Sequence, residues 1–461
     1  MRTSVKVRVR PGGSLRGQST VPGDKSIAHR WLILAVTATG RSSLEGVPHS
    51  LDIRSTASCL AQLAPTARPA LEAWASSPGS SDERHGSTWN RTASTLDLPA
   101  LDLHGEGRGS LRRPDRELDC GNSGTSMRVL AGLVASSPFV TVLTGDASLV
   151  KRPMERVAVP LRAMGAGVAT RDGHAPVTIH GGELHGIRFE PLVPSAQVKG
   201  AVLLAALEAD GATTVAESVP TRDHTERALS ALGVPVRATE SGIVLDGPFR
   251  HGGFGGKVPG DPSSAAFLLG AAALTRGEVA LSGVGLNPSR LAFLEVLERM
   301  GVEVDVEVEG SVLGEPVGTM HLASGGEVRP VHVGVGEVPL VIDEVPILAA
   351  LAAHADGPSR FAGASELRLK ESDRLSMLAD GIRSLGGLAD EDGDDLVIGG
   401  GGLRGGSARS GGDHRIVMAL TVAATAAAAS CEIDGAQSAA VSFPGFFGLL
   451  RSLGADVEEA R

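Results

Sequence analysis

The chain has 461 residues, enough for two or more domains that each bury a large core. Its formal net charge of -10 argues against a nucleic-acid partner, so an anion site would be a local basic pocket. Three cysteines, Cys59, Cys120 and Cys431, have no metal-ligand spacing and indicate a reducing compartment. Met1–Arg10 lacks the apolar core of a signal peptide, and the apolar runs are too short to span a bilayer. We therefore expect a cytoplasmic protein with no membrane partner.

In chain order, an Ala/Leu-rich apolar run recurs six times, and a polar cluster opens each run. These runs are too long for strands and poor in β-branched residues, so the sequence predicts buried helices. Free N–H groups and the positive end of the dipole make helix N-termini favourable for anions. Because several clusters carry Lys or Arg, they predict a cleft for a multiply charged anionic substrate. The clusters begin near Ser26, Thr125, Ala196, Ser263, Glu344 and His414.

A second, amphipathic helix follows each of these runs. Five of the six end in Leu-Gly or Met-Gly, which is typical of a helix C-terminus. Alternating stretches such as Val302–Val308 predict strands between the helices. The predicted helices are Leu51–Leu63, Arg156–Met164, Asp223–Leu232, Pro288–Met300, Glu371–Leu385 and Val441–Leu453.

The six units exceed one compact core, so a division into three plus three is expected. The repeat V-P-G-D-K-S at Val21 and V-P-G-D-P-S at Val258 supports it and places equivalent turns near the starts of the two halves. Ala64–Pro99 is rich in Ser, Pro, Ala and Thr and is expected to be a surface insertion or flexible loop.

Candidate binding residues of the first half lie in glycine turns and at helix starts. In Gly23-Asp24-Lys25-Ser26, Lys25 and Ser26 could meet an anion, with Arg30 one turn further along the helix. The alternative is a helix cap beside a solvated lysine. The other candidates are Gly124 with Arg128, Lys151-Arg152, Ser195-Ala196-Gln197 with Lys199, and Arg222. Their alternatives are, in turn, a structural turn, a solvated pair, and helix caps for the last two clusters.

The second half adds carboxylates. Asp343-Glu344 follows an apolar stretch, where a carboxylate could transfer protons or simply favour the helix dipole. Glu366–Arg374 is rich in charge, and Asp413-His414-Arg415 opens the sixth run. Only six residues are lysines, so lysines placed at the clusters are of interest because an ammonium is compact and can titrate. We favour a functional role for Lys25 and Lys370, and not for Lys6 or Lys257.

Taken together, the clusters resemble those of the 5-enolpyruvylshikimate-3-phosphate (EPSP) synthase family. The match is in order from about Val21 to Phe446, and each motif alone is weak whereas ten in order are specific. The motifs are V-P-G-D-K-S-I-A-H-R, C-G-N-S-G-T-S-M-R, G-D-A-S-L-V-K-R-P-M, S-A-Q-V-K-G-A, R-D-H-T-E, V-P-G-D-P-S-S-A-A-F, I-D-E-V-P, E-L-R-L-K-E-S-D-R, D-H-R-I-V-M and S-F-P-G-F.

The resemblance implies an α/β fold in the form of a two-domain inside-out α/β barrel. It implies six β-α-β-α-β-β repeats, three per domain, with an active site in the interdomain cleft. We expect the chain to cross between domains near Pro22 and near Pro248. Residues 1–21 plus 249–461 would form the first domain, and residues 22–248 the second, with the insertion at 64–99.

The resemblance also implies transfer of the enolpyruvyl group of phosphoenolpyruvate to the 5-hydroxyl of shikimate 3-phosphate, through a tetrahedral ketal phosphate. Asp343, Glu371 and Lys25 would be catalytic. Neither a metal nor an organic cofactor is implied, and we expect a monomer that glyphosate inhibits. Shikimate 3-phosphate would be held by Lys25, Ser26, Arg30, Ser195, Ala196, Gln197, Arg222, Asp343 and Lys370, and phosphoenolpyruvate by Lys25, Gly124, Arg152, Gln197, Arg374 and Arg415.

Two departures and two rivals accompany this interpretation. Ser123 and Ser126 replace alanines common in the Gly-Thr loop, and Val441 stands where some members carry a lysine. The sister enzyme acting on UDP-N-acetylglucosamine commonly has a cysteine where this chain has Gly145–Ser148, and it lacks K-E-S-D-R. A non-catalytic anion-binding protein could share the fold, but it would not require Asp343, Lys370 and Glu371.

Overall fold

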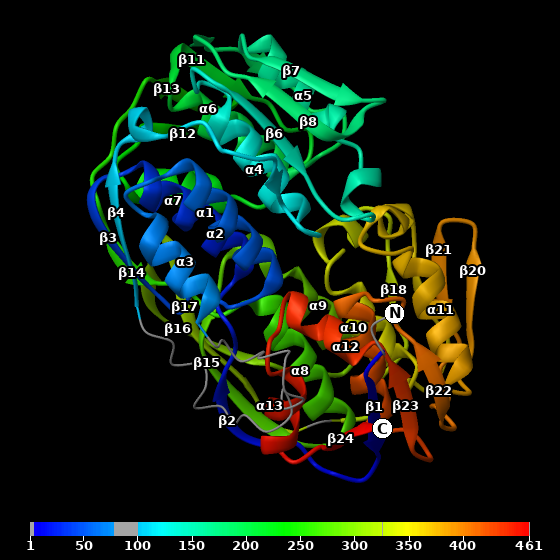
Figure 1. The fold of residues 1–461 in the computed structure, drawn as a ribbon. Helices are drawn as coiled ribbons and strands as arrows, with labels where there is room; N and C mark the ends of the chain where they lie inside the picture. The colour runs from blue at the N-terminus through cyan, green and yellow to red at the C-terminus, as the bar shows by residue number, and fades with distance from the viewer. Residues whose placement is uncertain (1–3, 78–99, 325, 461) are drawn as a thin grey trace.

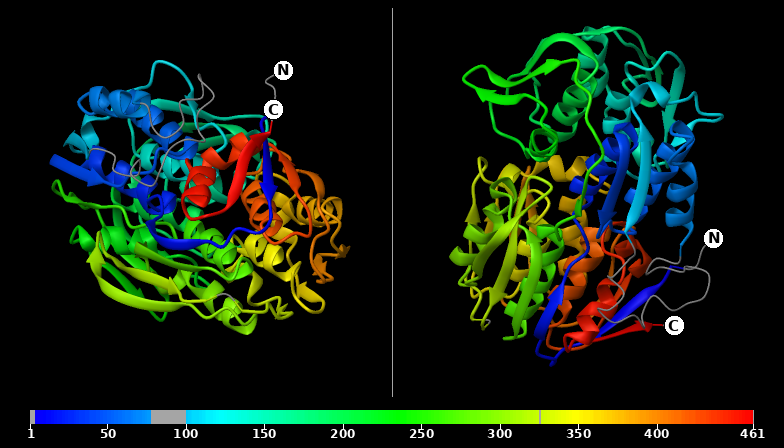
Figure 2. Two further views of the ribbon diagram at one scale, coloured as in Figure 1. Left: turned by 90° about the horizontal axis from the view of Figure 1, so that it is seen from below. Right: turned by 90° about the vertical axis from the view of Figure 1, so that its left-hand side faces the viewer.

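The computed structural model describes residues 4–77, 100–324 and 326–460, which form two lobes (Figure 1). We call the part built from β3–β14 the upper lobe, and the part built from β1, β2 and β15–β24 the lower lobe. Each lobe has a separate apolar core. The right-hand view of Figure 2 shows the same division from another direction. The expected α/β architecture of two domains is therefore confirmed.

Three small sheets build the upper lobe, and each combines parallel pairing at one edge with antiparallel pairing elsewhere. Parallel pairs require a crossover such as a helix, whereas antiparallel neighbours are joined by short turns. The sheets are β14(Gly255–Lys257)-β3(Thr39–Glu45)-β4(Leu101–Glu106); β5(Leu118–Asp119)-β6(Val140–Thr144)-β8(His174–His180)-β7(Gly167–Arg171); and β10(Arg188–Phe189)-β11(Ala209–Val215)-β13(Gly242–Gly247)-β12(Val236–Thr239), with β9(Leu184–His185) also on β11.

The lower lobe repeats this plan, and the N-terminal strands β1 and β2 complete two of its sheets. β1 lies between β23 and β24, so the first strand of the chain pairs with the last. The sheets are β16(Asp305–Val312)-β17(Glu315–Leu322)-β15(Glu278–Gly285)-β2(Arg16–Thr20); β18(His332–Val333)-β19(Ser359–Phe361)-β21(Asp395–Ile398)-β20(Ala389–Asp392); and β22(Gly406–Arg409)-β23(Cys431–Asp434)-β1(Lys6–Arg10)-β24(Asp456–Ala460).

The six apolar runs form helices, as predicted, and most of their residues are buried. Acidic or serine side chains cap five of them by accepting hydrogen bonds from backbone N–H groups in the first turn. The polar clusters therefore lie at helix N-termini. The helices are α1(Lys25–Thr37), α4(Gly124–Val134), α6(Ala196–Ala206), α8(Pro262–Leu274), α10(Val345–Ala352) and α12(His414–Ala424).

The second helix of each unit is also present, and the predicted glycine termini are confirmed. Gly165, Gly233, Gly301, Gly386 and Gly454 all have positive φ, the conformation that ends a helix. Three helices start later than predicted, because irregular or 3₁₀ turns occupy their first residues. The helices are α2(Leu51–Leu63), α5(Glu155–Ala163), α7(His224–Ala231), α9(Ala292–Arg299), α11(Arg374–Ser384) and α13(Phe446–Ser452).

The expectation of a flexible loop at Ala64–Pro99 is wrong for its first part. Arg68–Ser76 forms helix α3, whose Leu71 and Trp74 are buried in the upper core. The Trp74 ring packs on His49, with ring centroids 4.1 Å apart. The Ala/Leu content of this part favours a helix, which the average composition of the segment obscured. Residues 78–99 lie outside the described residues.

The second crossing between lobes lies later than Pro248. Strand β14, which follows Pro248, pairs with β3 of the upper lobe. Phe249 and Phe254 pack against the upper core, and Val258 is part of it. The chain therefore leaves the upper lobe after Val258, about where the second V-P-G-D motif begins. The expected boundary placed these residues in the wrong lobe because their apolar contacts are tertiary.

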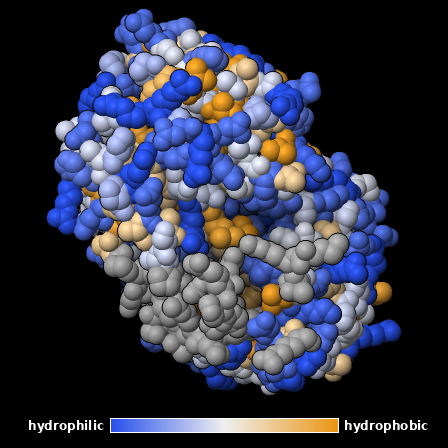
Figure 3. All heavy atoms as spheres, viewed as in Figure 1, coloured by the Kyte–Doolittle hydropathy of each residue, from blue (hydrophilic) through white to orange (hydrophobic). Residues whose placement is uncertain are grey.

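The coloured part of the face seen in Figure 3 is mainly hydrophilic. Where coloured residues are visible in Figure 3, hydrophobic ones are scattered and form no broad apolar area. Among the described residues, none of the helices combines the length and the apolar character needed to cross a bilayer.

Candidate active site

The upper-lobe segments that carry Ser148, Arg152 and Arg222 face the loops before α10 and α11 in the lower lobe. Among the described residues, ion pairs and hydrogen bonds join the two sides, and one of these pairs is Arg156 Nη2 with Glu366 Oε1 at 3.6 Å. The Arg222 guanidinium lies 2.7 Å from Asp343 Oδ2. Across the cleft, Arg152 Nη1 lies 3.9 Å from Oε1 of Glu371, and Ser148 Oγ donates a hydrogen bond to the backbone carbonyl of Glu371 at 3.1 Å. The structure therefore brings the separate sequence motifs into one site between the lobes.

Lys25 and Arg30 lie at the start of α1. The Lys25 ammonium is 2.8 Å from Asp52 Oδ2 on α2. Arg30, one turn further on, donates to the Ser26 carbonyl and to Thr225 Oγ1, each at 2.6 Å. Burial lowers the pKa of Arg30 below its ordinary value. Both cations thus stand at a helix N-terminus that already favours an anion.

Gln197 and Arg128 connect the starts of α6 and α4. Arg128 Nη1 donates to Gln197 Oε1 at 2.6 Å, and Gln197 Nε2 donates to Thr125 Oγ1 at 2.9 Å. Burial, with help from Arg152, lowers the pKa of Arg128 to about 10. The Ser195 hydroxyl accepts from Val198 N at 3.4 Å, so it has the capping role that sequence reasoning gave as the alternative. Ala196 is the first residue of α6.

Gly124 begins α4 beside two guanidinium groups. A Cβ at this position would lie 2.8 Å from Arg128 Nη1 and 3.2 Å from Arg152 Nη1. Arg152 Nη2 donates to Asn122 Oδ1 at 2.8 Å. The glycine therefore leaves space where two cations converge, which suits the close approach of a small anion.

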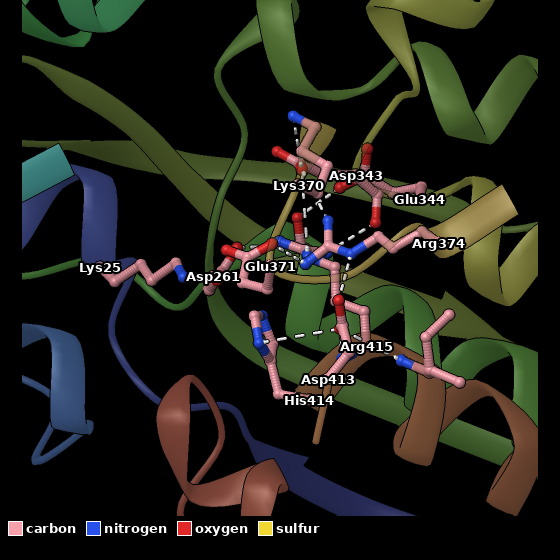
Figure 4. Close-up of polar contacts among 12 residues, drawn as sticks. Lys25, Asp261, Asp343, Glu344, Lys370, Glu371, Arg374, Asp413, His414 and Arg415 are labelled. Atoms are coloured by element: carbon pink, nitrogen blue, oxygen red, sulfur yellow. Dashed lines mark hydrogen bonds and ion pairs between the residues drawn. The ribbon is translucent and has the colours of Figure 1, made fainter. Parts of the chain in front are cut away.

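Asp343 lies at the centre of the lower side, surrounded by cations (Figure 4). Burial alone would raise the pKa of Asp343, but the surrounding cations hold it well below its usual range. The carboxylate is therefore ionised at neutral pH. Besides Arg222 at 2.7 Å, its oxygens lie 3.7 Å from Lys370 Nζ, 3.8 Å from Arg374 Nη1 and 4.0 Å from Arg415 Nε.

Glu371 is the second carboxylate of the lower side, and Arg374 holds it. Arg374 is almost wholly buried, pairs with Glu371, and donates from Nε to Asp413 Oδ2 at 2.8 Å. Burial would raise the pKa of Glu371, but Arg374, His414 and Arg152 hold it well below its usual range. Burial also lowers the pKa of Lys370. Arg415 Nη1 donates to the Asp343 carbonyl at 2.6 Å, which ties α12 to this loop.

Sequence reasoning missed two charged partners of the site. It did not single out Asp52, which pairs with Lys25, because it reads as an ordinary acidic residue in the first turn of α2. It noted Arg128 in the motif of Gly124 but did not place it among the binding residues. The signal for Arg128 was its position four residues after Gly124, on the same helix face.

Two further basic residues of the sequence motifs, Lys199 and His414, have other surroundings. Lys199 is buried and paired with Glu217 and Glu226, at 2.7 and 2.6 Å, so its charge is neutralised within the upper lobe. His414 is buried beside Asp413, and burial together with Lys25 lowers its pKa to about 3. It is therefore neutral at physiological pH.

Comparison with known proteins identifies the family. The family model described as EPSP synthase (3-phosphoshikimate 1-carboxyvinyltransferase) matches residues 9–82 and 100–450. The chain is 45% identical over 460 residues to the 3-phosphoshikimate 1-carboxyvinyltransferase of Halorhodospira halophila, covering 98% of this chain and 96% of that protein. It is 44% identical over 453 residues to the one of Acidithiobacillus ferrooxidans, covering 98% of both.

A solved structure indicates the same family. The EPSP synthase of Acinetobacter baumannii superposes with a TM-score of 0.82 at 37% identity, over 99% of this chain and 100% of that one. The order of motifs, the two-lobed fold and the full-length similarity agree. The chain belongs to the EPSP synthase (3-phosphoshikimate 1-carboxyvinyltransferase) family of enolpyruvyl transferases.

Proposed function

We propose that the two ionised carboxylates of the cleft, Asp343 and Glu371, carry out the proton transfers of the family's reaction together with Lys25. As a member of this family the protein transfers the enolpyruvyl group of phosphoenolpyruvate to the 5-hydroxyl of shikimate 3-phosphate, in aromatic amino acid biosynthesis. The observation that carries the assignment is that both carboxylates are partly buried yet held ionised among cations from both lobes. An ionised carboxylate can accept a proton in the reaction.

Shikimate 3-phosphate is assigned mainly to the upper side. Its phosphate and carboxylate need cations and free N–H groups, which the start of α6 and the buried Arg30 supply. Asp343 and Lys370, 3.7 Å apart, would contact the reacting hydroxyl from the lower side. The proposed contacts are Lys25, Ser26, Arg30, Ser195, Ala196, Gln197, Arg222, Asp343 and Lys370.

Phosphoenolpyruvate is assigned to the region between Gly124 and the lower arginines. Arg152 and Arg374 approach Glu371 from opposite lobes, so a small anion between them would be held from both sides. Gly124 leaves the space for it. The proposed contacts are Lys25, Gly124, Arg152, Gln197, Arg374 and Arg415, and Arg128 joins them through its bond to Gln197.

The chemistry then divides into addition and elimination. Asp343 takes the proton of the 5-hydroxyl, whose oxygen forms a bond to C2 of phosphoenolpyruvate, while Lys25 delivers a proton to the methylene carbon. This gives the tetrahedral ketal phosphate. Glu371 then removes a proton from the new methyl group, the double bond re-forms, and the bond to the phosphate oxygen breaks to release phosphate. The cations stabilise the charge on both substrates throughout.

Three finer statements belong to the same proposal. Glyphosate, which carries a carboxylate and a phosphonate, is expected to occupy the phosphoenolpyruvate region. A monomer is expected, because one chain supplies both sides of the cleft. A cytoplasmic location is expected, because the three cysteines are buried free thiols.

The test is a phosphate-release assay with phosphoenolpyruvate and either shikimate 3-phosphate or UDP-N-acetylglucosamine. The proposal requires release with shikimate 3-phosphate alone as acceptor. Release only with the UDP-sugar would support the sister enzyme. Tight binding of shikimate 3-phosphate without any turnover would support a non-catalytic anion-binding protein.

A further inference from the structure

The two V-P-G-D motifs pair with each other where the chain crosses between the lobes. Asp24 N donates to the Pro259 carbonyl at 2.7 Å, and Asp261 N donates to the Pro22 carbonyl at 2.9 Å. Gly23 and Gly260 form the antiparallel bridge between these bonds. The two crossing segments are thus held together by reciprocal backbone contacts between equivalent residues.

The two aspartates have the same local role. Asp24 Oδ1 accepts from Ser26 N at 2.6 Å and from Ile27 N at 3.1 Å, which caps α1. Asp261 Oδ1 accepts from Ser263 N at 2.9 Å, which caps α8. A shift of either crossing segment would therefore shift the start of a buried helix.

Arg290 binds both aspartates at once. It lies in a 3₁₀ turn after β15, and its side chain is 3% exposed. Its Nη1 is 2.6 Å from Asp24 Oδ2, and its Nη2 is 3.1 Å from Asp261 Oδ1 and 2.7 Å from Ser263 Oγ. One planar guanidinium with several fixed donors can span two carboxylates in this way, whereas an ammonium is a point charge.

The same guanidinium also reaches the loop that carries Asp343. Its Nη2 lies 3.9 Å from Glu344 Oε1, and the Ser263 hydroxyl that it contacts is hydrogen-bonded to Glu344 as well. Burial would raise the pKa of Asp24, yet Arg290 holds it below its usual range. The positive charge of Arg290 therefore has a strong effect on the crossing segments.

One residue next to Lys25 and one residue next to Asp343 are thus both in contact with Arg290. Asp24 precedes Lys25, the first residue of α1 in the upper lobe, and Glu344 follows Asp343 in the lower lobe. We propose that Arg290 is a positioning residue that fixes Lys25 relative to Asp343 across the two crossing segments. This inference rests on the proposed roles of Lys25 and Asp343.

The test compares Arg290→Lys with Arg299→Lys. Arg299, nine residues later, forms an exposed ion pair with Glu337 at 2.7 Å and serves as the matched control. Arg290→Lys keeps the charge but cannot span both aspartates, so kcat should fall about 10- to 100-fold through misplacement of reacting groups. The KM for shikimate 3-phosphate should stay within about threefold, because most of its proposed contacts lie in the upper lobe alone. Arg299→Lys should change neither.

A purely structural role would lower the melting temperature of Arg290→Lys without changing kcat per folded molecule. Retention of kcat within about twofold by folded Arg290→Lys would overturn the inference. If this variant does not fold, Ser263→Ala removes the 2.7 Å contact to Arg290 together with the hydrogen bond from Ser263 to Glu344, and it should lower kcat in the same direction with unchanged KM; an unchanged kcat would again overturn the inference. If Lys25→Arg and Asp343→Asn themselves remain active, the proposed function fails instead.

Discussion

The two sides of the cleft use arginine in different ways. On the upper side, Arg30, Arg128 and Arg152 donate to the neutral side chains Thr225, Gln197 and Asn122. On the lower side, Arg374 donates to the carboxylates of Asp413 and Glu371. These three upper arginines therefore carry positive charge that these hydrogen-bond partners do not neutralise, whereas carboxylates of the same lobe balance the charge of Arg374.

The pKa values follow the same division. Burial lowers the pKa of Arg128 to about 10, and it also lowers that of Arg30. Burial would do the same to Arg374, but Asp413 and Glu371 raise its pKa above the ordinary value. An uncompensated buried cation gains most from an anionic ligand. The difference supports the proposal that the upper side binds a charged substrate and the lower side holds carboxylates for proton transfer.

The largest effect is expected from Asp343→Asn, which removes the central carboxylate of the lower side. Loss of a positioned general base costs on the order of 10²–10⁴ in rate, so kcat should fall by that factor. Steady-state phosphate release measures it. Asp380→Asn, in an exposed pair with Arg383, is the control and should be silent. An Asp343→Asn enzyme with more than about a tenth of the normal kcat would show that the base lies elsewhere.

Lys25→Arg tests whether the upper side supplies more than charge. A guanidinium is bulkier than the ammonium that pairs with Asp52 at 2.8 Å, and it does not give up its proton. We expect kcat to fall by about 10² or more. Lys6→Arg, on the exposed part of β1, should be silent. Circular dichroism confirms folding, and near-normal turnover by Lys25→Arg would reduce Lys25 to an electrostatic anchor.

Gly124→Ala narrows the space between the upper guanidinium groups. The new Cβ would lie 2.8 Å from Arg128 Nη1, so this flexible side chain must move. We expect the KM for phosphoenolpyruvate to rise about tenfold, as for overpacking of a tight site, and glyphosate inhibition to weaken with it. Inhibition curves for both proteins give the answer. Strong glyphosate resistance of the unmodified protein, with Gly124 in place, would show that the loop binds substrate differently.

The smallest expected effect is a change in the free energy of unfolding with pH, and it tests the charge balance of the lower side. The pKa of His414 is about 3 when folded, against an ordinary value near 6.5, so the unfolded chain binds more protons between these pH values. The contribution of His414 to the free energy of unfolding has its full value above about pH 6.5, and it decreases as the pH is lowered. At pH 5 it should have lost about 2 kcal/mol.

Urea unfolding at pH 7.5 and pH 5 measures this loss. His414→Gln should lose about 2 kcal/mol less than the unmodified protein between these two pH values. The partly exposed His321 provides a control, because His321→Gln should leave the loss unchanged. Equal losses for His414→Gln and the unmodified protein would show that protonation of His414 does not destabilise the folded protein.

Much of the fold follows from patterns within the chain. The apolar runs marked the six buried helices, and the glycines after Met164 and Leu232 marked helix ends, because period and backbone conformation are local properties. Helix α3 and the second crossing were misplaced. Helix α3 was hidden by the biased composition of its segment. The second crossing depends on the pairing of β14 with β3, which are far apart in the sequence.

The candidate site shows the same limit. Helix N-termini rich in Lys and Arg pointed to Lys25, Arg30 and Gln197, and the resemblance supplied their roles. The Arg222–Asp343 pair at 2.7 Å joins residues of different lobes, and no local pattern predicts it. Arg290 was missed because N-P-S-R resembles the start of an amphipathic helix, while its partners Asp24 and Asp261 are distant in sequence.

The division of labour between the two sides is tested most directly by calorimetric titration of shikimate 3-phosphate into Asp343→Asn and Arg30→Met. The account predicts that Asp343→Asn, although inactive, binds with a Kd within about fivefold of the unmodified protein. Arg30→Met should bind at least about tenfold more weakly, because it loses a charge-assisted hydrogen bond to the ligand. The reverse pattern, with binding lost in Asp343→Asn and kept in Arg30→Met, would contradict the account.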